Sequence, residues 1–213
     1  MTLNNFEICA RILGFNHNAQ LESGGKSSVH FALDVTAAGV DIALCDSNFD
    51  SASSSGVEYF QHNLRLGANA GGWLESNIRT KILADIFDAL PQDWQEIISP
   101  CTKFTNNAGG GFNVESQISA TQDKLFLLSE FEVFGIQDYA AEVEQNFQLQ
   151  YEYFKTGNEK IHFKQDISEP CYWWLRTPQF SNDTSFCRVD VAGVENTYNA
   201  LYSQGIVPCF AVF

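Results

Sequence analysis

Positive charge is scarce in this sequence. The 213 residues include only 12 Lys and Arg against 26 Asp and Glu, which gives a formal net charge of −14. A nucleic-acid-binding protein needs clustered cations to displace phosphate counterions, and an anionic membrane surface repels an acidic chain. The composition therefore excludes both kinds of partner. We interpret the acidic residues as a solvated face, which resists self-association and suits a basic partner.

Long hydrophobic runs are lacking too. No stretch approaches the roughly 20 consecutive apolar residues of a membrane span. The N-terminal residues lack the basic region followed by an apolar region that marks a signal peptide, so none is expected. Hydrophobic residues nevertheless make up 45% of the chain and aromatic residues 14%, which excludes a disordered protein. A chain of this length buries roughly 70% of its unfolded surface. No linker or repeat divides it, so we expect a single domain over residues 1–213.

The six cysteines form no Cys-x-x-Cys pair, which argues against a zinc site or a redox pair. If the cysteines were oxidised, the sequence alone would not determine which of the possible disulfide pairings forms. Cys9, Cys187 and Cys209 lie in apolar alternations. We therefore expect reduced, buried thiols that pack as small hydrophobic groups, in a reducing compartment.

Periodicity predicts few helices and much irregular chain. Between Ser76 and Leu90 the apolar residues recur on one face at helical spacing, Ser76 or Asn77 can cap the start, and Pro91 ends the segment. A second, shorter helix is predicted over residues 92–98. Strand patterns cover residues 6–13, 29–35, 124–128, 185–191 and 206–213, and turn-forming residues predict loops over 46–56, 105–111 and 179–185. These features predict an α+β fold.

No segment matches a metal-binding or phosphate-binding motif. The run from Asp46 to Asp50 begins like an EF-hand calcium loop, but Ser51 and Val57 stand where that loop requires glycine and glutamate. Gly109–Gly111 has no following Lys-Ser/Thr pair, so we interpret it as a turn.

Titratable residues are present without the arrangement that catalysis needs. The four histidines share no metal-ligand spacing, and we interpret each as a surface or hydrogen-bonded core residue. A Cys–His nucleophile pair stays open, but no local feature activates a thiol. The acid pairs Glu130/Glu132 and Glu142/Glu144 have the residue type of a glycosidase, although so acidic a chain contains such pairs in any case. We predict no catalytic residue, no metal site and no cofactor.

The segment from Cys171 to Pro178 is the most unusual one. Its adjacent tryptophans bury large areas, so we predict a core anchor in which Arg176 stacks or pairs with an acid. From Gln179 to Gln204 the chain mixes Tyr, Asn and Ser with occasional Arg, a composition typical of antibody-type binding surfaces. A solvated hairpin is the alternative. The candidate ligand-binding residues are Phe180, Asn182, Asp183, Arg188, Asp190, Tyr198, Leu201 and Tyr202.

Motifs along the chain resemble one known family. They are Gly71-Gly-Trp73, Ile78-Arg-Thr80, Thr121-Gln-Asp-Lys-Leu-Phe-Leu-Leu-Ser-Glu130, Glu132-Val-Phe-Gly135, Gln150-Tyr-Glu-Tyr-Phe-Lys155, Trp173-Trp-Leu-Arg-Thr-Pro178, Ser185-Phe-Cys187, Asn199-Ala200 and Gly205-Ile-Val-Pro208. In this order they resemble a domain of unknown function with a C-type-lectin-like fold, found in bacterial surface and phage proteins. That family includes the variable proteins of diversity-generating retroelements, whose C-terminal segment is rewritten to change ligand specificity. The resemblance spans roughly residues 6–213.

The resemblance implies a C-type-lectin-like fold with two helices, small antiparallel sheets, long irregular loops and paired terminal strands. It also implies that residues 171–213 form a variable region which binds a protein or glycan on another cell or particle. Adenine-directed mutation of Asn codons reaches a restricted set of residue types. The eight candidate residues fit that set, whereas Gln179, Glu195 and Gln204 do not and are expected to be fixed scaffold.

Two departures and two alternatives accompany this hypothesis. Thr177 stands where family members often have Ser, and the loop from Asp46 to Val57 is longer than expected. The first alternative is a fixed-specificity structural or adhesion component of a phage particle or cell surface. The second, less favoured one is an enzyme on the same fold. Under the main hypothesis the protein is associated with a virion, or cytoplasmic before assembly or export.

Overall fold

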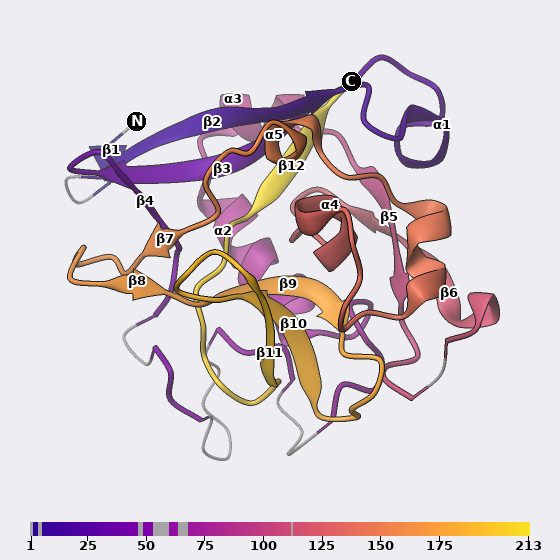
Figure 1. The fold of residues 1–213 in the computed structure, drawn as a ribbon. Helices are drawn as coiled ribbons and strands as arrows, with labels where there is room; N and C mark the ends of the chain where they lie inside the picture. The colour runs from indigo at the N-terminus through magenta and orange to yellow at the C-terminus, as the bar shows by residue number, and fades with distance from the viewer. Residues whose placement is uncertain (1, 4–5, 47–48, 53–59, 64–67, 112) are drawn as a thin grey trace.

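Several small sheets and short helices make up the fold, which confirms the predicted α+β class (Figure 1). The computed structural model describes residues 2–3, 6–46, 49–52, 60–63, 68–111 and 113–213, and side chains from residue 8 onward. Over these residues, no helix combines the length and the apolar character that crossing a membrane would require.

The largest sheet has seven strands and contains both ends of the described chain. Its strands are β1 (Thr2–Leu3), β2 (Phe6–Phe15), β3 (Val29–Ala37), β4 (Val40–Ile42), β7 (His162–Phe163), β8 (Pro170–Cys171) and β12 (Cys209–Val212). β2 pairs antiparallel along one edge of β3, and β4 and β12 pair with the other edge. The terminal strands therefore share a sheet as expected, but β3 separates them. They do not pair directly, because β3 offers one edge to each.

Two helices follow each other where periodicity predicted them. A π-helical turn, η1 (Ile78–Ile82), continues into α2 (Leu83–Ala89), and α3 (Gln92–Ile97) follows after Pro91. The predicted apolar face is buried at Ile78, Ile82 and Leu83. The Ser76 hydroxyl accepts the Arg79 backbone N–H at 3.1 Å, which satisfies one of the free amides of the first turn.

The other helices of the described residues are three to six residues long and carry no periodic signal. They are α1 (Ala19–Glu22), η2 (Glu115–Gln117), α4 (Glu130–Phe134), η3 (Glu142–Phe147) and α5 (Glu152–Lys155). α4 has a complete capping box, in which Ser129 and Glu132 each satisfy the other's backbone N–H. Its C-cap, Gly135, takes a left-handed conformation with φ of 71°.

Two smaller sheets complete the architecture. β5 (Cys101–Asn106) pairs with β6 (Ile118–Asp123), and β9 (Trp173–Pro178), β10 (Ser185–Val189) and β11 (Glu195–Asn199) form the third sheet. The loop predicted over 105–111 therefore begins two residues too early, because Thr105 and Asn106 pair across β6. The strand predicted over 124–128 is also wrong. This segment is a buried connection that meets β12 at one bridge, Phe126 to Cys209.

The core is rich in aromatic side chains, as the composition predicted. Trp73, Trp173, Trp174 and Tyr151 are all at most 1% exposed. All six cysteines are free, and five of them are buried. Cys9 is the exception, because its position on β2 leaves the side chain exposed. Its predicted burial is therefore wrong.

The rejected calcium loop lies only partly within the described residues. Residues 47–48 and 53–57 lie outside them. At its described ends, the Asp46 carboxylate accepts a hydrogen bond from the Ser203 hydroxyl at 3.1 Å, and the Asp50 backbone N–H donates to the Ser203 carbonyl at 2.7 Å. These polar groups connect the loop to the C-terminal part of the chain.

Candidate binding surface

The candidate residues are arranged around the β9–β10–β11 sheet. β9 and β10 are buried along their whole length, whereas β11 is half-buried throughout and forms the outer edge. On the central strand, Arg188 lies opposite Trp174 of β9 and Asn196 of β11. The sheet therefore supports β11 on the buried strand β10 and leaves its side chains partly exposed.

The side chain of Arg188 lies between two tyrosine rings. Its guanidinium carbon is 3.7 Å from the centre of the Tyr172 ring and 4.1 Å from that of Tyr198. Nε donates to Asn196 Oδ1 at 3.1 Å, and Nη1 donates to Gln204 Oε1 at 3.3 Å. The residue is 7% exposed, and this burial lowers the pKa of Arg188 below its ordinary value. Four side chains thus fix one guanidinium group.

Tyr202 extends this arrangement toward solvent. Its ring lies 4.7 Å from that of Tyr198, centre to centre, at an angle of 53°, and both side chains are half-buried. Burial and the charge of Asp50 raise the pKa of Tyr198 above 10. We call the group formed by Tyr172, Arg188, Tyr198 and Tyr202 the tyrosine–arginine surface. Aromatic area combined with a guanidinium is the composition of interface hot spots.

The loop between β9 and β10 carries three further candidates at one end of the sheet. Phe180 is half-buried, and its backbone N–H donates to the Tyr139 carbonyl at 2.8 Å. Asn182 and Asp183 are exposed. The Asn182 side-chain oxygen accepts the backbone N–H of Thr184 at 2.7 Å, so it closes a turn of the loop.

Two residues from distant segments hold this loop in place. The Asn69 amide group donates to the carbonyls of Asn182 and Ser185 at 2.7 and 2.9 Å, and accepts the Gly110 N–H at 2.9 Å. A Cβ atom at Gly110 would lie only 2.2 Å from the Asn182 carbonyl oxygen. Only glycine permits this approach. The glycine run, interpreted from sequence as a turn, therefore also supports the candidate loop.

Asp190 and Leu201 lie in turns at the ends of β10 and β11. The Asp190 carboxylate accepts the backbone N–H groups of Ala192 and Val194 at 2.7 and 3.1 Å, which closes the β10–β11 connection. Leu201 is half-buried, and its backbone N–H donates to the Asn199 side chain at 3.0 Å. Both residues thus help to shape the turns that flank the surface.

The structure therefore brings three of the eight candidates together and distributes the others over the sheet ends. Arg188, Tyr198 and Tyr202 form the cluster. Two residues beside this cluster were not predicted. Tyr172 contacts Arg188, and Asp50 is linked to it through Gln204, from segments whose proximity no local pattern shows. The sequence analysis placed Gln204 in the fixed scaffold, and in the structure this side chain is fully buried beneath the cluster.

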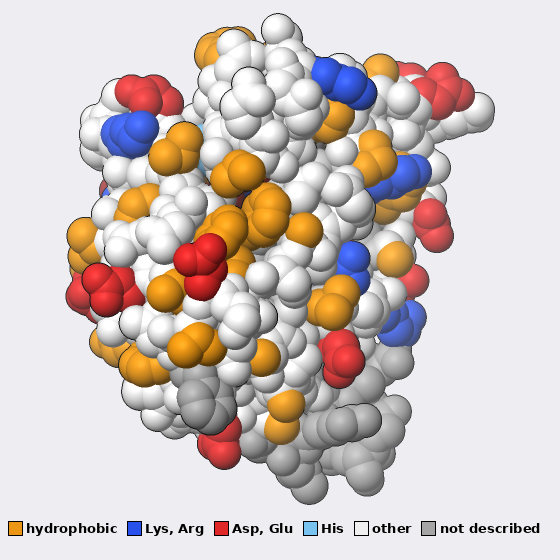
Figure 2. All heavy atoms as spheres, turned by 90° about the vertical axis from the view of Figure 1, so that its right-hand side faces the viewer, with side chains coloured by type: hydrophobic (Ala, Val, Ile, Leu, Met, Phe, Trp, Pro, Cys, Tyr) orange, Lys and Arg blue, Asp and Glu red, His pale blue; other side chains and the backbone are white. Residues whose placement is uncertain are grey.

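A second face is more apolar. Figure 2 shows hydrophobic side chains gathered near the middle of the side on which β5 and β6 lie in Figure 1. On this part of the fold, Phe104 and Phe147 stack at 5.4 Å between ring centres, and both are half-buried. Specific recognition also needs placed polar groups, so the tyrosine–arginine surface is the better candidate.

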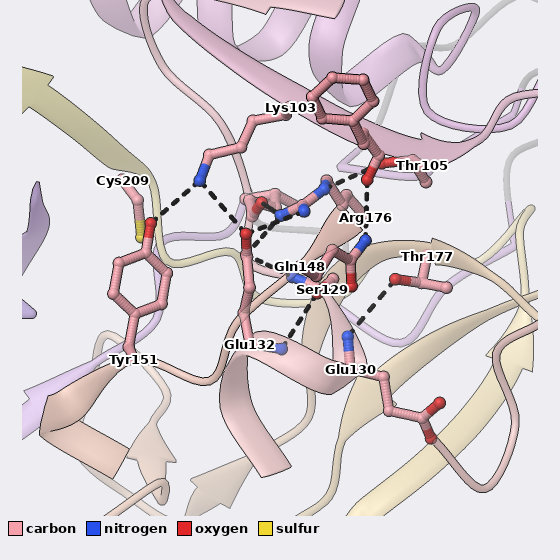
Figure 3. A network of polar contacts seen from close by, with 12 residues as sticks. Lys103, Thr105, Ser129, Glu130, Glu132, Gln148, Tyr151, Arg176, Thr177 and Cys209 are labelled. Carbon is pink, nitrogen blue, oxygen red and sulfur yellow. Dashed lines mark hydrogen bonds and ion pairs between the residues drawn. The ribbon is translucent and has the colours of Figure 1, made fainter. Parts of the chain in front are cut away.

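A network of charged and polar side chains lies inside the molecule (Figure 3). The Lys103 ammonium is 2.5 Å from Glu22 Oε2, 3.2 Å from Glu132 Oε1 and 3.0 Å from the Tyr151 hydroxyl. The Arg176 guanidinium donates to both oxygens of Glu132, at 2.5 and 2.9 Å. Two carboxylates thus face two cations. Burial opposes ionisation, but Arg176 and Lys103 hold the pKa of Glu132 well below its ordinary value.

This buried network contains groups that could ligate a metal. The ligand atoms of His17, Glu22 and Glu132 lie within 4.8 Å of one another, and so do those of Glu22, His30 and Cys101. Lys103, however, already contacts both Glu22 and Glu132, and a second cation there would repel its ammonium group. We therefore interpret the network as a structural element that links α1, β5, α4 and β9.

In each of the acid pairs Glu130/Glu132 and Glu142/Glu144, the two carboxyl groups lie in different surroundings. The Glu130 carboxylate accepts the backbone N–H of Ala140 at 2.7 Å, whereas Glu132 faces Arg176. Glu142 is exposed, and buried Glu144 accepts the Asn106 backbone N–H at 2.7 Å. Burial raises the pKa of Glu130 and Glu144 to about 7. These carboxyl groups lose their protons near pH 4.5 in the unfolded chain but only near pH 7 in the folded state. Ionisation therefore favours the unfolded chain, and the stability that these groups contribute is lost as the pH rises from 4.5 to 7.

The four histidines are buried, and this burial predicts their titration. Desolvation of the imidazolium lowers the pKa from 6.5 to about 2 in His17, about 3 in His30 and His62, and about 4 in His162. Below pH 6.5 the unfolded chain binds protons that the folded chain does not bind. The histidines thus contribute stability that is present above pH 6.5 and is lost as the pH falls.

We expect the four imidazole Cε1–H signals in NMR spectra of the folded protein to stay at their neutral positions from about pH 8 to about pH 5. In the urea-unfolded chain they should titrate near 6.5. A folded-state signal that titrates at the ordinary pKa would contradict the burial of that histidine.

Comparison with known proteins gives one family match. Residues 52–212 match the family described as Domain of unknown function (DUF6273). No curated protein and no solved structure matches the chain significantly. The matched segment is more than half of the chain and includes the whole β9–β10–β11 sheet. The chain therefore belongs to the DUF6273 family.

Proposed function

We propose that this protein is a ligand-binding domain which recognises a protein or glycan on another cell or particle through the tyrosine–arginine surface. The observation that carries the proposal is the placement of Arg188 between Tyr172 and Tyr198, with Tyr202 beside them. Rigid aromatic side chains give contact area at a low entropic cost, and a fixed guanidinium adds directional hydrogen bonds. No catalytic step is part of this proposal.

The scaffold in this proposal is C-type-lectin-like, and its C-terminal part, residues 171–213, is the variable region of a diversity-generating retroelement protein. The features in favour are the shared sheet of the terminal strands, the consecutive helices and the small third sheet. Most of the fixed and changeable positions also differ in burial, with buried Arg188 as the exception among the changeable ones. Trp173, Trp174 and Gln204 are buried, while Asn182, Asp183 and Tyr202 lie at the surface or half-buried.

Sequencing of the DNA around the gene tests the variable region. A near-copy of the segment encoding residues 171–213, differing only at adenines and lying beside a reverse-transcriptase gene, is expected. If no such copy is found, the diversified region is refuted, and a binding domain of fixed specificity takes its place.

A double variant, Tyr198→Ala with Tyr202→Ala, tests the binding surface itself. The wild type and the variant are each applied to an array of immobilised cell-surface proteins and glycans. We expect the variant to lose binding to the molecules that bind the wild type, because both aromatic rings are removed. The fold should survive. Tyr202→Ala is expected to leave the melting temperature nearly unchanged, and Tyr198→Ala to cost about 1 kcal/mol for its contact with Arg188.

Phe15→Ala is the matched control, since Phe15 is an aromatic residue on β2 with 67% of its surface exposed. It should bind as the wild type does. Equal loss in the control and the double variant would refute the assignment of the surface. A wild-type oligomer that the double variant dissociates would instead favour a structural component.

A further inference from the structure

Arg188 differs from the other arginines that the structure describes. Arg11, Arg79 and Arg176 each contact at least one carboxylate within ion-pair distance. Arg188 contacts none among the described residues, although the chain holds 26 acidic residues. Its hydrogen-bond acceptors are the neutral amide oxygens of Asn196 and Gln204. A charge this deeply buried is ordinarily paired.

Among the described residues, Asp50 and Asp190 act on Arg188 through their charge, and both are engaged elsewhere. Asp50 Oδ1 accepts from the Gln204 amide at 3.0 Å, so Gln204 lies between this carboxylate and Arg188. The Asp190 carboxylate closes its own turn through the N–H groups of Ala192 and Val194. Both charges act on Arg188 only at a distance.

One edge of the guanidinium is open. Nε and Nη1 each have an acceptor, whereas Nη2 has none among the described residues. The residue is not completely enclosed, since 7% of its surface is exposed. A guanidinium carries five N–H donors in a planar fork that fits a carboxylate with two parallel hydrogen bonds.

We infer that the ligand supplies the missing counter-ion, a carboxylate on an Asp or Glu side chain of a protein partner, which binds at the open edge of Arg188. This inference rests on the proposed function and narrows it to one ligand chemistry. The rings of Tyr172 and Tyr198 lie 3.7 and 4.1 Å from the guanidinium carbon, so an anion is expected to approach at the edge of the group rather than through the rings. A carboxylate accepts hydrogen bonds at such an edge, and Asp and Glu side chains present this group on protein surfaces without any modification.

The chemistry of the surroundings indicates the kind of partner. Tyrosine-rich surfaces with a central arginine are typical of protein recognition. The net charge of −14 repels a partner that is acidic overall. The carboxylate is therefore expected to stand alone within a neutral or basic surface, where the pair is desolvated and only weakly screened by salt.

The test is a titration of the full chain followed by NMR of the Arg188 Nε–H group. N-acetyl-glutamate amide is the probe, and N-acetyl-glutamine amide is its neutral match. We expect the glutamate probe to shift the Arg188 signal saturably, with a dissociation constant on the order of 10 mM, since one ion pair provides only a small part of a usual binding free energy. The glutamine probe should leave the signal in place.

Two controls separate this effect from non-specific charge. The Nε–H signal of Arg79, which already pairs with Asp123 at 2.6 Å, should not move. Arg188→Lys keeps the positive charge but removes the planar guanidinium donors. Because this variant has no Arg188 signal, binding is followed at the backbone amide of Tyr198, where the glutamate probe should bind about tenfold more weakly than to the wild type. The wild-type signal of Arg188 is read independently, so the test does not depend on how the variant folds.

An unmoved Arg188 signal would overturn the inference, and so would equal shifts with both probes. Tighter binding of glucuronate than of the glutamate probe would replace the protein partner with an acidic glycan, and tighter binding of phosphate would overturn the choice of a carboxylate. These failures are distinct from failure of the proposed function. If Tyr198→Ala with Tyr202→Ala abolishes array binding while the glutamate probe has no effect, the surface binds but does not use a carboxylate.

Discussion

Arg176→Met is expected to lower the free energy of unfolding by about 3–5 kcal/mol, the cost of breaking a buried ion pair by removing one partner. Arg176 and Glu132 are both fully buried, and two hydrogen bonds join them. Methionine fills a similar volume, so the loss comes from charge rather than from a cavity. Without the guanidinium, Glu22 and Glu132 face Lys103 alone, and one buried negative charge is left without a counter-ion.

The network also loses neutral contacts in this variant. The Arg176 side chain donates to the Thr105 hydroxyl and to the Leu127 carbonyl, both at 2.9 Å. These acceptors are buried and would lie against an apolar side chain, which adds to the cost. Arg176→Lys should be intermediate, since an ammonium keeps the charge but cannot make the two parallel bonds.

Urea unfolding followed by tryptophan fluorescence measures this loss. Asp85→Asn is the control, because the ion pair between Lys81 and Asp85 lies on the exposed face of the helix. It should change the unfolding free energy by less than about 1 kcal/mol. If Arg176→Met lost no more than this control, the network would have to be open to water, contrary to its complete burial.

The features predicted correctly from sequence are those that depend on neighbours along the chain. The helix between Ser76 and Pro91 was found because its apolar residues recur at helical spacing and its ends carry a cap and a proline. The strands β2, β3 and β10 were found from apolar alternation, and the loop at 179–185 from its turn-forming residues. Each of these signals lies within one continuous segment of at most 16 residues.

Two of the errors in the prediction come from segments that are buried on both sides. β9 is buried at every position, including Arg176 and Thr177, so it shows no alternation that would identify a strand. The apolar segment from Lys124 to Leu128 has the composition of a strand. It nevertheless pairs at a single bridge, because its surroundings supply side-chain packing instead of a partner strand.

The candidate site was predicted in part for the same reason. Tyr198 and Tyr202 belong to a polar, tyrosine-rich segment that composition alone marks as a surface. Tyr172 was counted with the core anchor, and Asp50 with a rejected metal loop. Only the tertiary fold shows that Tyr172 contacts Arg188 and that Asp50 is linked to it through Gln204, since local spacing does not encode contacts between distant segments.

Trp174→Ala is the second substitution for which we expect a very large effect, a loss of about 3–5 kcal/mol in the free energy of unfolding. The side chain is fully buried, its Nε1–H donates to the Phe60 carbonyl at 3.1 Å, and its ring meets that of His62 edge-on at 5.0 Å. Alanine leaves a large cavity and an unsatisfied carbonyl. Trp94→Ala, at a half-buried tryptophan of α3, should cost less because solvent can fill part of the space.

This substitution also connects the core to the surface. Trp174 lies opposite Arg188 in the sheet, and its backbone N–H donates to the Gly205 carbonyl at 2.8 Å, next to Gln204. A cavity beneath this strand pair should loosen the guanidinium, so Trp174→Ala is expected to weaken binding as well as stability. Thermal unfolding and array binding measured on the same preparation test both effects. Full binding by a strongly destabilised variant would show that the tyrosine–arginine surface keeps its shape without the tryptophan beneath it.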